Sequence, residues 1–142
     1  MIYFTYDHDA DWKELSSFIE ETRERGLPCP YGNMEQLVKA AADKGDHLYL
    51  FQDEEKEQLT GWSWFKEVKG QLVIHGAGIG DIQNQGKLLY TIIRLALRHS
   101  EKNKPVRIDI PHDSTYLTKL YELFSARTTS LGDICQITIY HP

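Results

Sequence analysis

One stretch of the chain, residues 71–99, combines the residue types that bind phosphate groups. An apolar run leads into a segment dense in glycine, a polar turn follows, and a strongly apolar helix is expected from about Lys87. The glycines of this stretch are Gly76, Gly78, Gly80 and Gly86. A helix N-terminus after such a turn binds phosphate because its first N–H groups lack partners within the helix and carry partial positive charge. The alternative is that the glycines only let the chain bend and approach its neighbours.

The spacing within this stretch excludes a P-loop nucleotide site. That motif has four residues between its two glycines and a serine or threonine after its lysine. Here five residues separate Gly80 from Gly86, and Leu88 follows Lys87, so the hydroxyl that would bind Mg²⁺ is missing. The six histidines and two cysteines also lack the spacing of a zinc site, and we predict no bound metal.

Hydrophobic periodicity and turn residues predict one α/β domain over residues 1–142. The expected order is β-α-α-β-β-β-α-β-α-β-β. The expected strands are Met1–Tyr6, His47–Gln52, Leu59–Val68, Gln71–Ile79, Val106–Ile110, a short strand before a turn at Ser130–Asp133, and Ile134–Tyr140. The apolar positions of the expected helices include Trp12 to Thr22, Met34 to Ala41, Leu89 to Leu97 and Leu117 to Phe124. Short turns favour an antiparallel meander in the middle, and helical connections favour crossovers later. The prediction is a mixed sheet with helices on both faces.

The charge balance argues against nucleic acid as a partner, since the net charge is −5. Residues 1–57 carry 14 acidic and 6 basic side chains, whereas residues 58–142 carry 7 and 10. An acidic half beside a mildly basic half suits a cationic substrate and an anionic cofactor; the alternative is that these charges only solvate helix faces. No apolar run reaches a membrane span and no secretory signal is visible, so we expect no membrane partner and a cytoplasmic location.

The order of elements resembles the GNAT family, the GCN5-related N-acetyltransferases. The signature of that family, Gln/Arg-x-x-Gly-x-Gly/Ala, opens the helix that holds the pyrophosphate of acetyl-CoA. With Gly86 at its last position, Asp81 replaces the first residue and Asn84 replaces the first glycine. The family's downstream apolar positions then fall on Leu89, Ile93 and Leu97. The other register, Gln83–Leu88, keeps the glutamine and first glycine but shifts this apolar pattern, so we prefer the former.

A second match lies at Ser114–Phe124, which resembles the family's Asn-x-x-Ala-x-x-x-Tyr-Glu-Lys-x-Gly-Phe stretch. Tyr121 and Glu122 agree with it, and Ser114 stands at the asparagine. In the family this tyrosine lies near the cofactor sulfur and often protonates the leaving thiolate. The resemblance therefore implies Tyr121 as a catalytic residue, and the alternative is a core aromatic whose hydroxyl is hydrogen-bonded.

The resemblance implies an acetyl-CoA-dependent N-acetyltransferase. The expected cofactor-binding residues are Ala77, Gly78, Ile79, Asn84, Gln85, Gly86, Lys87, Leu88 and Ser114. Helix N–H groups at residues 85–88 would hold the pyrophosphate, and N–H groups near Ala77–Ile79 would face the thioester oxygen if the glycines bulge the strand. A base must deprotonate the amine, and His75 and Glu67 are candidates only because they lie near the central strands.

The acceptor implied by the acidic half is a primary amine of a small molecule or peptide, cationic in character. The alternative function is a non-catalytic GNAT-like module that binds a CoA thioester as a sensor or mediates protein contact. The altered residues Asp81, Asn84 and Ser125 favour this alternative, and the intact Tyr121 disfavours it. The sequence does not name the acceptor, and it leaves open whether the chain forms a homodimer.

Overall fold

Seven strands and four helices form the part of the chain that the structure describes. The structure is a computed structural model and describes residues 2–22, 34–55, 58–80, 85–101, 104–111 and 116–141. The strands are β1 (Ile2–Thr5), β2 (His47–Gln52), β3 (Leu59–Val68), β4 (Gln71–Ile79), β5 (Val106–Pro111), β6 (Ala126–Leu131) and β7 (Ile134–Ile139). The helices are α1 (His8–Thr22), α2 (Met34–Asp43), α3 (Gln85–His99) and α4 (Tyr116–Leu123). This order confirms the one predicted from periodicity.

The boundaries differ from the prediction by one residue at the C-terminal ends of β1, β5 and β7, and by two or three residues at α3 and at the β6–β7 turn. Helix α3 begins at Gln85, two residues before the predicted start, and ends at His99 instead of near residue 102. The turn expected over Ser130–Asp133 is shorter, because β6 extends to Leu131. Only two residues then connect β6 to β7, and Gly132 adopts the left-handed φ of 64° that so tight a hairpin requires.

The strands form one mixed sheet in the order β1-β2-β3-β4-β5-β7-β6. All neighbours are antiparallel except β4 and β5, which are parallel and joined through α3. This confirms the predicted meander of β2, β3 and β4 and the predicted crossover after β4. A parallel pair requires such a crossover, since the chain must return to the starting edge of the sheet.

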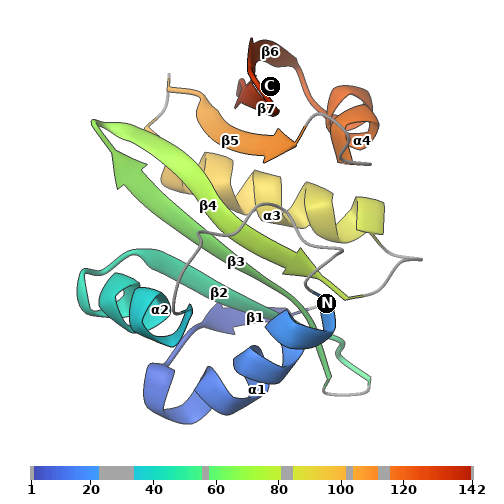
Figure 1. The fold of residues 1–142 in the computed structure, drawn as a ribbon. Helices are drawn as coiled ribbons and strands as arrows, with labels where there is room; N and C mark the ends of the chain where they lie inside the picture. Colours follow the sequence, from blue (N-terminus) through green and yellow to red (C-terminus); the bar gives the residue numbers. More distant parts are fainter. Residues whose placement is uncertain are drawn as a thin grey trace.

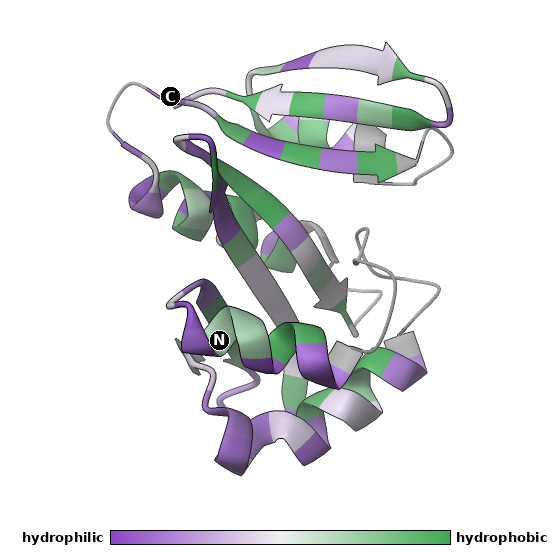
Figure 2. Ribbon diagram, turned by 60° about the vertical axis from the view of Figure 1, so that its left-hand side comes forward, coloured by the Kyte–Doolittle hydropathy of each residue, from purple (hydrophilic) through white to green (hydrophobic). Residues whose placement is uncertain are grey.

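Helices cover both faces of the sheet, as predicted. Helix α1 packs on β3 and β4, α2 packs on β2, and α3 packs on the other face against β3 and β4. Figure 1 shows α3 lying behind the central strands, and Figure 2 shows α1 and α2 over the β1–β4 half, apart from the β5–β7 half. Strand β4 is therefore buried on both faces along most of its length, which explains its nearly continuous apolar sequence.

Two apolar clusters stabilise these layers. One lies beneath α3 and includes Leu89, Ile93 and Ile108, all with no exposed surface. The other lies beneath α1 and α2 and includes both Trp62 and Trp64. The two tryptophans share a face because side chains alternate along a strand, as predicted. Apolar packing thus holds both faces of the sheet where β4 meets its neighbouring strands.

Candidate functional site

A β-bulge interrupts β4 at His75. Trp64 of β3 pairs with Gly76, but the next residue, Phe65, pairs with Ile74, so His75 is an extra residue without a partner. A bulge bends its strand and increases the local twist. The glycine-rich strand is therefore bent in the middle, as the sequence suggested.

The parallel pairing of β4 with β5 stops at the bulge. It comprises only Val73 with Arg107 and Ile74 with Ile108, although both strands continue beyond these residues. Figure 1 shows the two strands diverging toward their arrowheads, with the first turn of α3 at the same end. We call the space between residues 75–79 of β4 and residues 109–111 of β5 the β4–β5 gap.

The direction of one hydrogen bond shows which backbone groups of β4 face this gap. The N–H of Gly80 donates to the carbonyl oxygen of Thr60 on β3, at 2.9 Å. Successive N–H groups of a strand point to opposite sides. The N–H of Gly78 therefore also points to β3, whereas those of Ala77 and Ile79 point to the β4–β5 gap. No described strand pairs with them there.

Two of the glycines are explained by close packing. A Cβ atom on Gly78 would lie 2.4 Å from the indole nitrogen of Trp62, and one on Gly80 would lie 2.8 Å from the Phe18 ring. Phe18 belongs to α1, which can approach β4 only because these positions have no side chain. At Gly78 and Gly80 the structure thus supports the close-approach interpretation of the glycine-rich segment.

The N-terminus of α3 is a site of positive potential. Its first turn includes Gln85, Gly86, Lys87 and Leu88, whose N–H groups precede the first i→i−4 bonds of the helix. The helix has no acidic residue in this turn and ends with Arg98 and His99, so its own charges leave the positive end of the dipole uncompensated. Leu88 is buried in the core, which leaves only its backbone for a ligand.

Lys119 of α4 adds a charge at the same place. Its ammonium nitrogen lies 3.7 Å from the position that a Cβ of Gly86 would occupy. Lys87 is exposed on the first turn itself. Neither lysine forms an ion pair with another described residue. The helix N-terminus and the Lys119 ammonium therefore lie together at Gly86, with Lys87 exposed on the same turn, and such an arrangement binds anions.

Tyr121 lies on the same helix as Lys119. Its side chain is 48 % exposed, whereas the preceding Leu120 is fully buried and holds α4 against the core. The tyrosine hydroxyl has no hydrogen bond to any described residue. It is therefore an exposed polar group and not a core aromatic. Asn84 and Ser114, which the sequence also assigned to the cofactor, lie outside the described residues.

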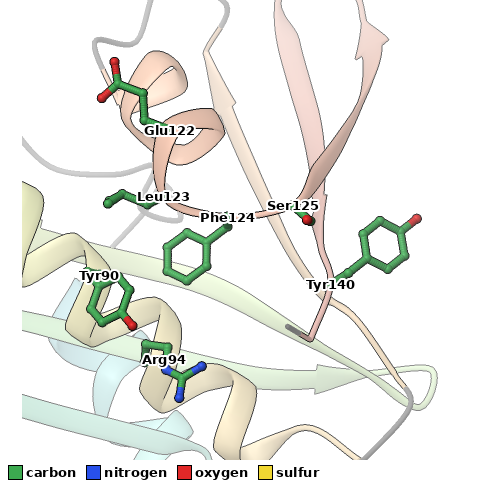
Figure 3. A pocket seen from close by; sticks show the side chains of 7 residues that line it. All are labelled: Tyr90, Arg94, Glu122, Leu123, Phe124, Ser125 and Tyr140. Carbon is green, nitrogen blue, oxygen red and sulfur yellow. The ribbon is translucent and has the colours of Figure 1, made fainter.

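An open groove runs between α3 and the end of α4. It encloses about 370 Å³ and is lined by Tyr90, Arg94, Glu122, Leu123, Phe124, Ser125 and Tyr140. Figure 3 shows the rings of Tyr90 and Phe124 close together, and their centroids are 5.5 Å apart. Gly86, Tyr90 and Arg94 follow one another at four-residue spacing, so the two groove residues of α3 lie on the same face of the helix as Gly86.

Three solved structures share this architecture over nearly the whole chain. An aminoglycoside 6'-acetyltransferase type Ii aligns with a TM-score of 0.69 and 14% identity, covering 100% of this chain and 99% of the other. The NatC complex bound to Gag peptide and CoA gives 0.67 and 10% identity, covering 99% and 98%. A spermidine N-acetyltransferase mutant from Vibrio cholerae gives 0.66 and 12% identity, covering 99% and 95%. The chain has the GNAT fold.

Comparison of sequences does not detect the GNAT fold in this chain. No family model matches the chain, and no curated protein sequence matches it. The fold prediction made from element order is confirmed by the neighbours, which are acetyltransferases. Among the described helices, none combines the length and apolar character needed to cross a bilayer.

Sequence reasoning missed two parts of the site in this GNAT-fold chain. Lys119 lies two residues before Tyr121, in the second motif, but nothing in its spacing predicted contact with Gly86. Of the groove residues, Phe124 was predicted only as an apolar position of its helix, and Tyr90 was not singled out. Their proximity depends on how α4 docks on α3, which no local pattern encodes.

Proposed function

We propose that this protein is an N-acetyltransferase that uses acetyl-CoA. The observation that carries the proposal is the β4–β5 gap itself. A bulge at His75 ends the pairing of β4 with β5 and turns the N–H groups of Ala77 and Ile79 toward the gap, beside a basic helix N-terminus. Two of the three solved structures with this fold are acetyltransferases, and the third, the NatC complex, is bound to CoA.

The residues present fit the cofactor. A pyrophosphate needs several N–H donors and positive charge, and the first turn of α3 with Lys87 and Lys119 supplies both. Gly86 keeps the approach to these N–H groups free of a side chain. Acetyl-CoA supplies an acetyl group bound to sulfur as a thioester, which an amine can attack. We assign Ala77, Ile79, Gln85, Gly86, Lys87 and Leu88 to its binding by their backbones or charge, with Asn84 and Ser114 kept from the sequence.

Two further roles follow for the chain's own groups. The N–H groups of Ala77 and Ile79 stabilise an oxygen that gains negative charge in the β4–β5 gap, because fixed donors in a site of low dielectric need no reorganisation. Gly78, which the sequence also assigned to the cofactor, lies between these two residues, and its N–H points to β3. Tyr121 gives a proton to the departing sulfur through its exposed hydroxyl.

The proposed acceptor is a cationic primary amine of a small molecule or peptide. The structural neighbours include a spermidine N-acetyltransferase, an aminoglycoside 6'-acetyltransferase and a complex bound to a peptide. In this chain, burial and, to a smaller extent, a cluster of nearby acidic residues raise the pKa of the Tyr6 hydroxyl well above its ordinary value. Its members are Asp7, Asp9, Asp11 and Glu35. We place the reaction in the cytoplasm, and we leave the oligomeric state open.

The test is binding followed by turnover. Isothermal calorimetry with CoA and acetyl-CoA should show one site per chain, and a panel of spermidine, kanamycin and an alanyl peptide should release free thiol from acetyl-CoA with at least one member. Failure of both ligands to bind would remove the proposal. Binding without thiol release for any amine would favour the sensor alternative.

A further inference from the structure

The bulge at His75 decides where its side chain lies. In a strand, side chains alternate between faces, but the extra residue places His75 and Gly76 together on the face opposite α3. The His75 ring contacts Trp64, with centroids 4.6 Å apart and planes at 77°. Trp64 belongs to the cluster beneath α1 and α2. His75 therefore stands at the mouth of the β4–β5 gap, on the face away from the first turn of α3.

The charged groups around His75 come from three elements. Lys66 lies on β3, Asp46 lies before β2, and Asp109 lies on β5 across the gap. The Trp64 indole N–H donates a hydrogen bond to Asp46 at 3.0 Å, and this bond holds both residues in place beside the His75 ring. Asp109 Oδ1 forms a 3.6 Å ion pair with Arg107 Nε, and neither of these two buried atoms has a hydrogen-bond partner.

These surroundings favour the neutral imidazole. Burial, with a smaller contribution from Lys66, lowers the pKa of His75 below its ordinary value, and Asp46 and Asp109 oppose this shift without reversing it. A neutral imidazole has one ring nitrogen with a free electron pair, so it can accept a proton at pH 7. The two nearby carboxylates also favour a cationic group beside it.

We infer that His75 is the general base that takes a proton from the ammonium group of the acceptor, bound between His75 and Asp109. This inference rests on the proposed function and concerns the side of the β4–β5 gap where the acceptor amine binds. The other candidate, Glu67, pairs with Leu72 near the β3–β4 turn and is exposed there. It lies before the bulge, where β4 and β5 are still paired, and so does not face the gap.

The proton balance is complete with these groups. The ammonium gives one proton to His75, which becomes an imidazolium, and the freed electron pair of the amine forms the C–N bond as the C–S bond breaks. The departing sulfur gains its proton from the Tyr121 hydroxyl. The nitrogen loses its second proton to solvent as the amide forms, and solvent reprotonates the Tyr121 oxygen. The imidazolium returns its proton to solvent. The products are an amide, a thiol and one released proton.

The experiment compares wild type with His75→Gln over pH, using the amine of the panel with the highest kcat/KM. Wild type should show an acidic limb in kcat/KM with a pKa below 6.5, matching the imidazole titration of His75 by NMR in the unliganded protein. His75→Gln should lower kcat/KM on the order of 10²-fold at pH 7. The loss should shrink as pH rises, because a growing fraction of the amine is then unprotonated.

The control is His47→Gln, a histidine of β2 that packs against His99. It should keep the wild-type pH profile. CoA affinity measured by calorimetry should be the same in all three proteins, which shows that the variants are folded. A His75→Gln profile that keeps the acidic limb, or a loss that stays constant as pH rises, overturns the inference. Absence of thiol release by wild type with any amine contradicts the proposed function instead.

Discussion

Substitution of Gly78 by alanine tests whether this glycine is required by packing. The added Cβ would lie 2.4 Å from Nε1 and 2.8 Å from Cδ1 of Trp62. Trp62 is 2 % exposed and cannot move into solvent. Overpacking of this kind costs about 1–3 kcal/mol. For 142 residues, the entropy of unfolding makes 1 kcal/mol equivalent to about 3 °C in Tm, so we expect a fall of about 3–10 °C.

Differential scanning calorimetry of the ligand-free protein measures this fall. Gly86→Ala is the matched control, because its Cβ would meet nothing closer than 3.7 Å and its φ is not left-handed. Alanine is also the better helix former, so the control should be neutral or slightly more stable. A Tm of Gly78→Ala equal to that of wild type would refute the packing argument.

The remaining predictions concern ligand binding, catalysis and pH. Lys119→Gln should weaken CoA binding about 2- to 5-fold at low salt and less at high salt, since the lysine is exposed. Calorimetry at two salt concentrations measures this change, and an equal loss of CoA affinity in Lys39→Gln would contradict it. Tyr121→Phe should lower kcat on the order of 10²-fold and leave CoA affinity unchanged; an unchanged kcat removes Tyr121 from the mechanism. Burial and the neighbouring His47 lower the pKa of His99 in the folded protein. As pH falls below about 6.5, His99 is therefore protonated in the unfolded chain before it is protonated in the folded chain, and the free energy of unfolding declines. His99→Gln should flatten this decline in urea unfolding between pH 7 and pH 5, and an unchanged slope would contradict it.

The fold was predictable because each element carries its own pattern. Strands β2, β3 and β4 begin and end at the predicted residues, since turn residues flank runs of strand-forming side chains. Helix α3 was equally clear from its apolar face, which is buried as expected. Its start was placed two residues late because Gly86 was taken as part of the turn, whereas glycine is tolerated in a first helical turn.

The site was only partly predictable because it depends on pairing between distant residues. The glycines suggested a bent strand, but the bulge at His75 is defined by the register of β3 against β4, which the sequence does not state. The end of the β4–β5 pairing follows from that bulge. The contact of Lys119 with Gly86 likewise requires the docking of α4 on α3.

The central claim is that the β4–β5 gap and the first turn of α3 hold a CoA thioester. A titration with CoA followed by ¹H–¹⁵N NMR tests it directly, because every N–H group assigned to binding gives its own signal. We predict that the largest shifts fall on Ala77, Ile79, Gly86 and Lys87. Saturating CoA that leaves these four signals unchanged, or that shifts only amides of other elements, would contradict the account.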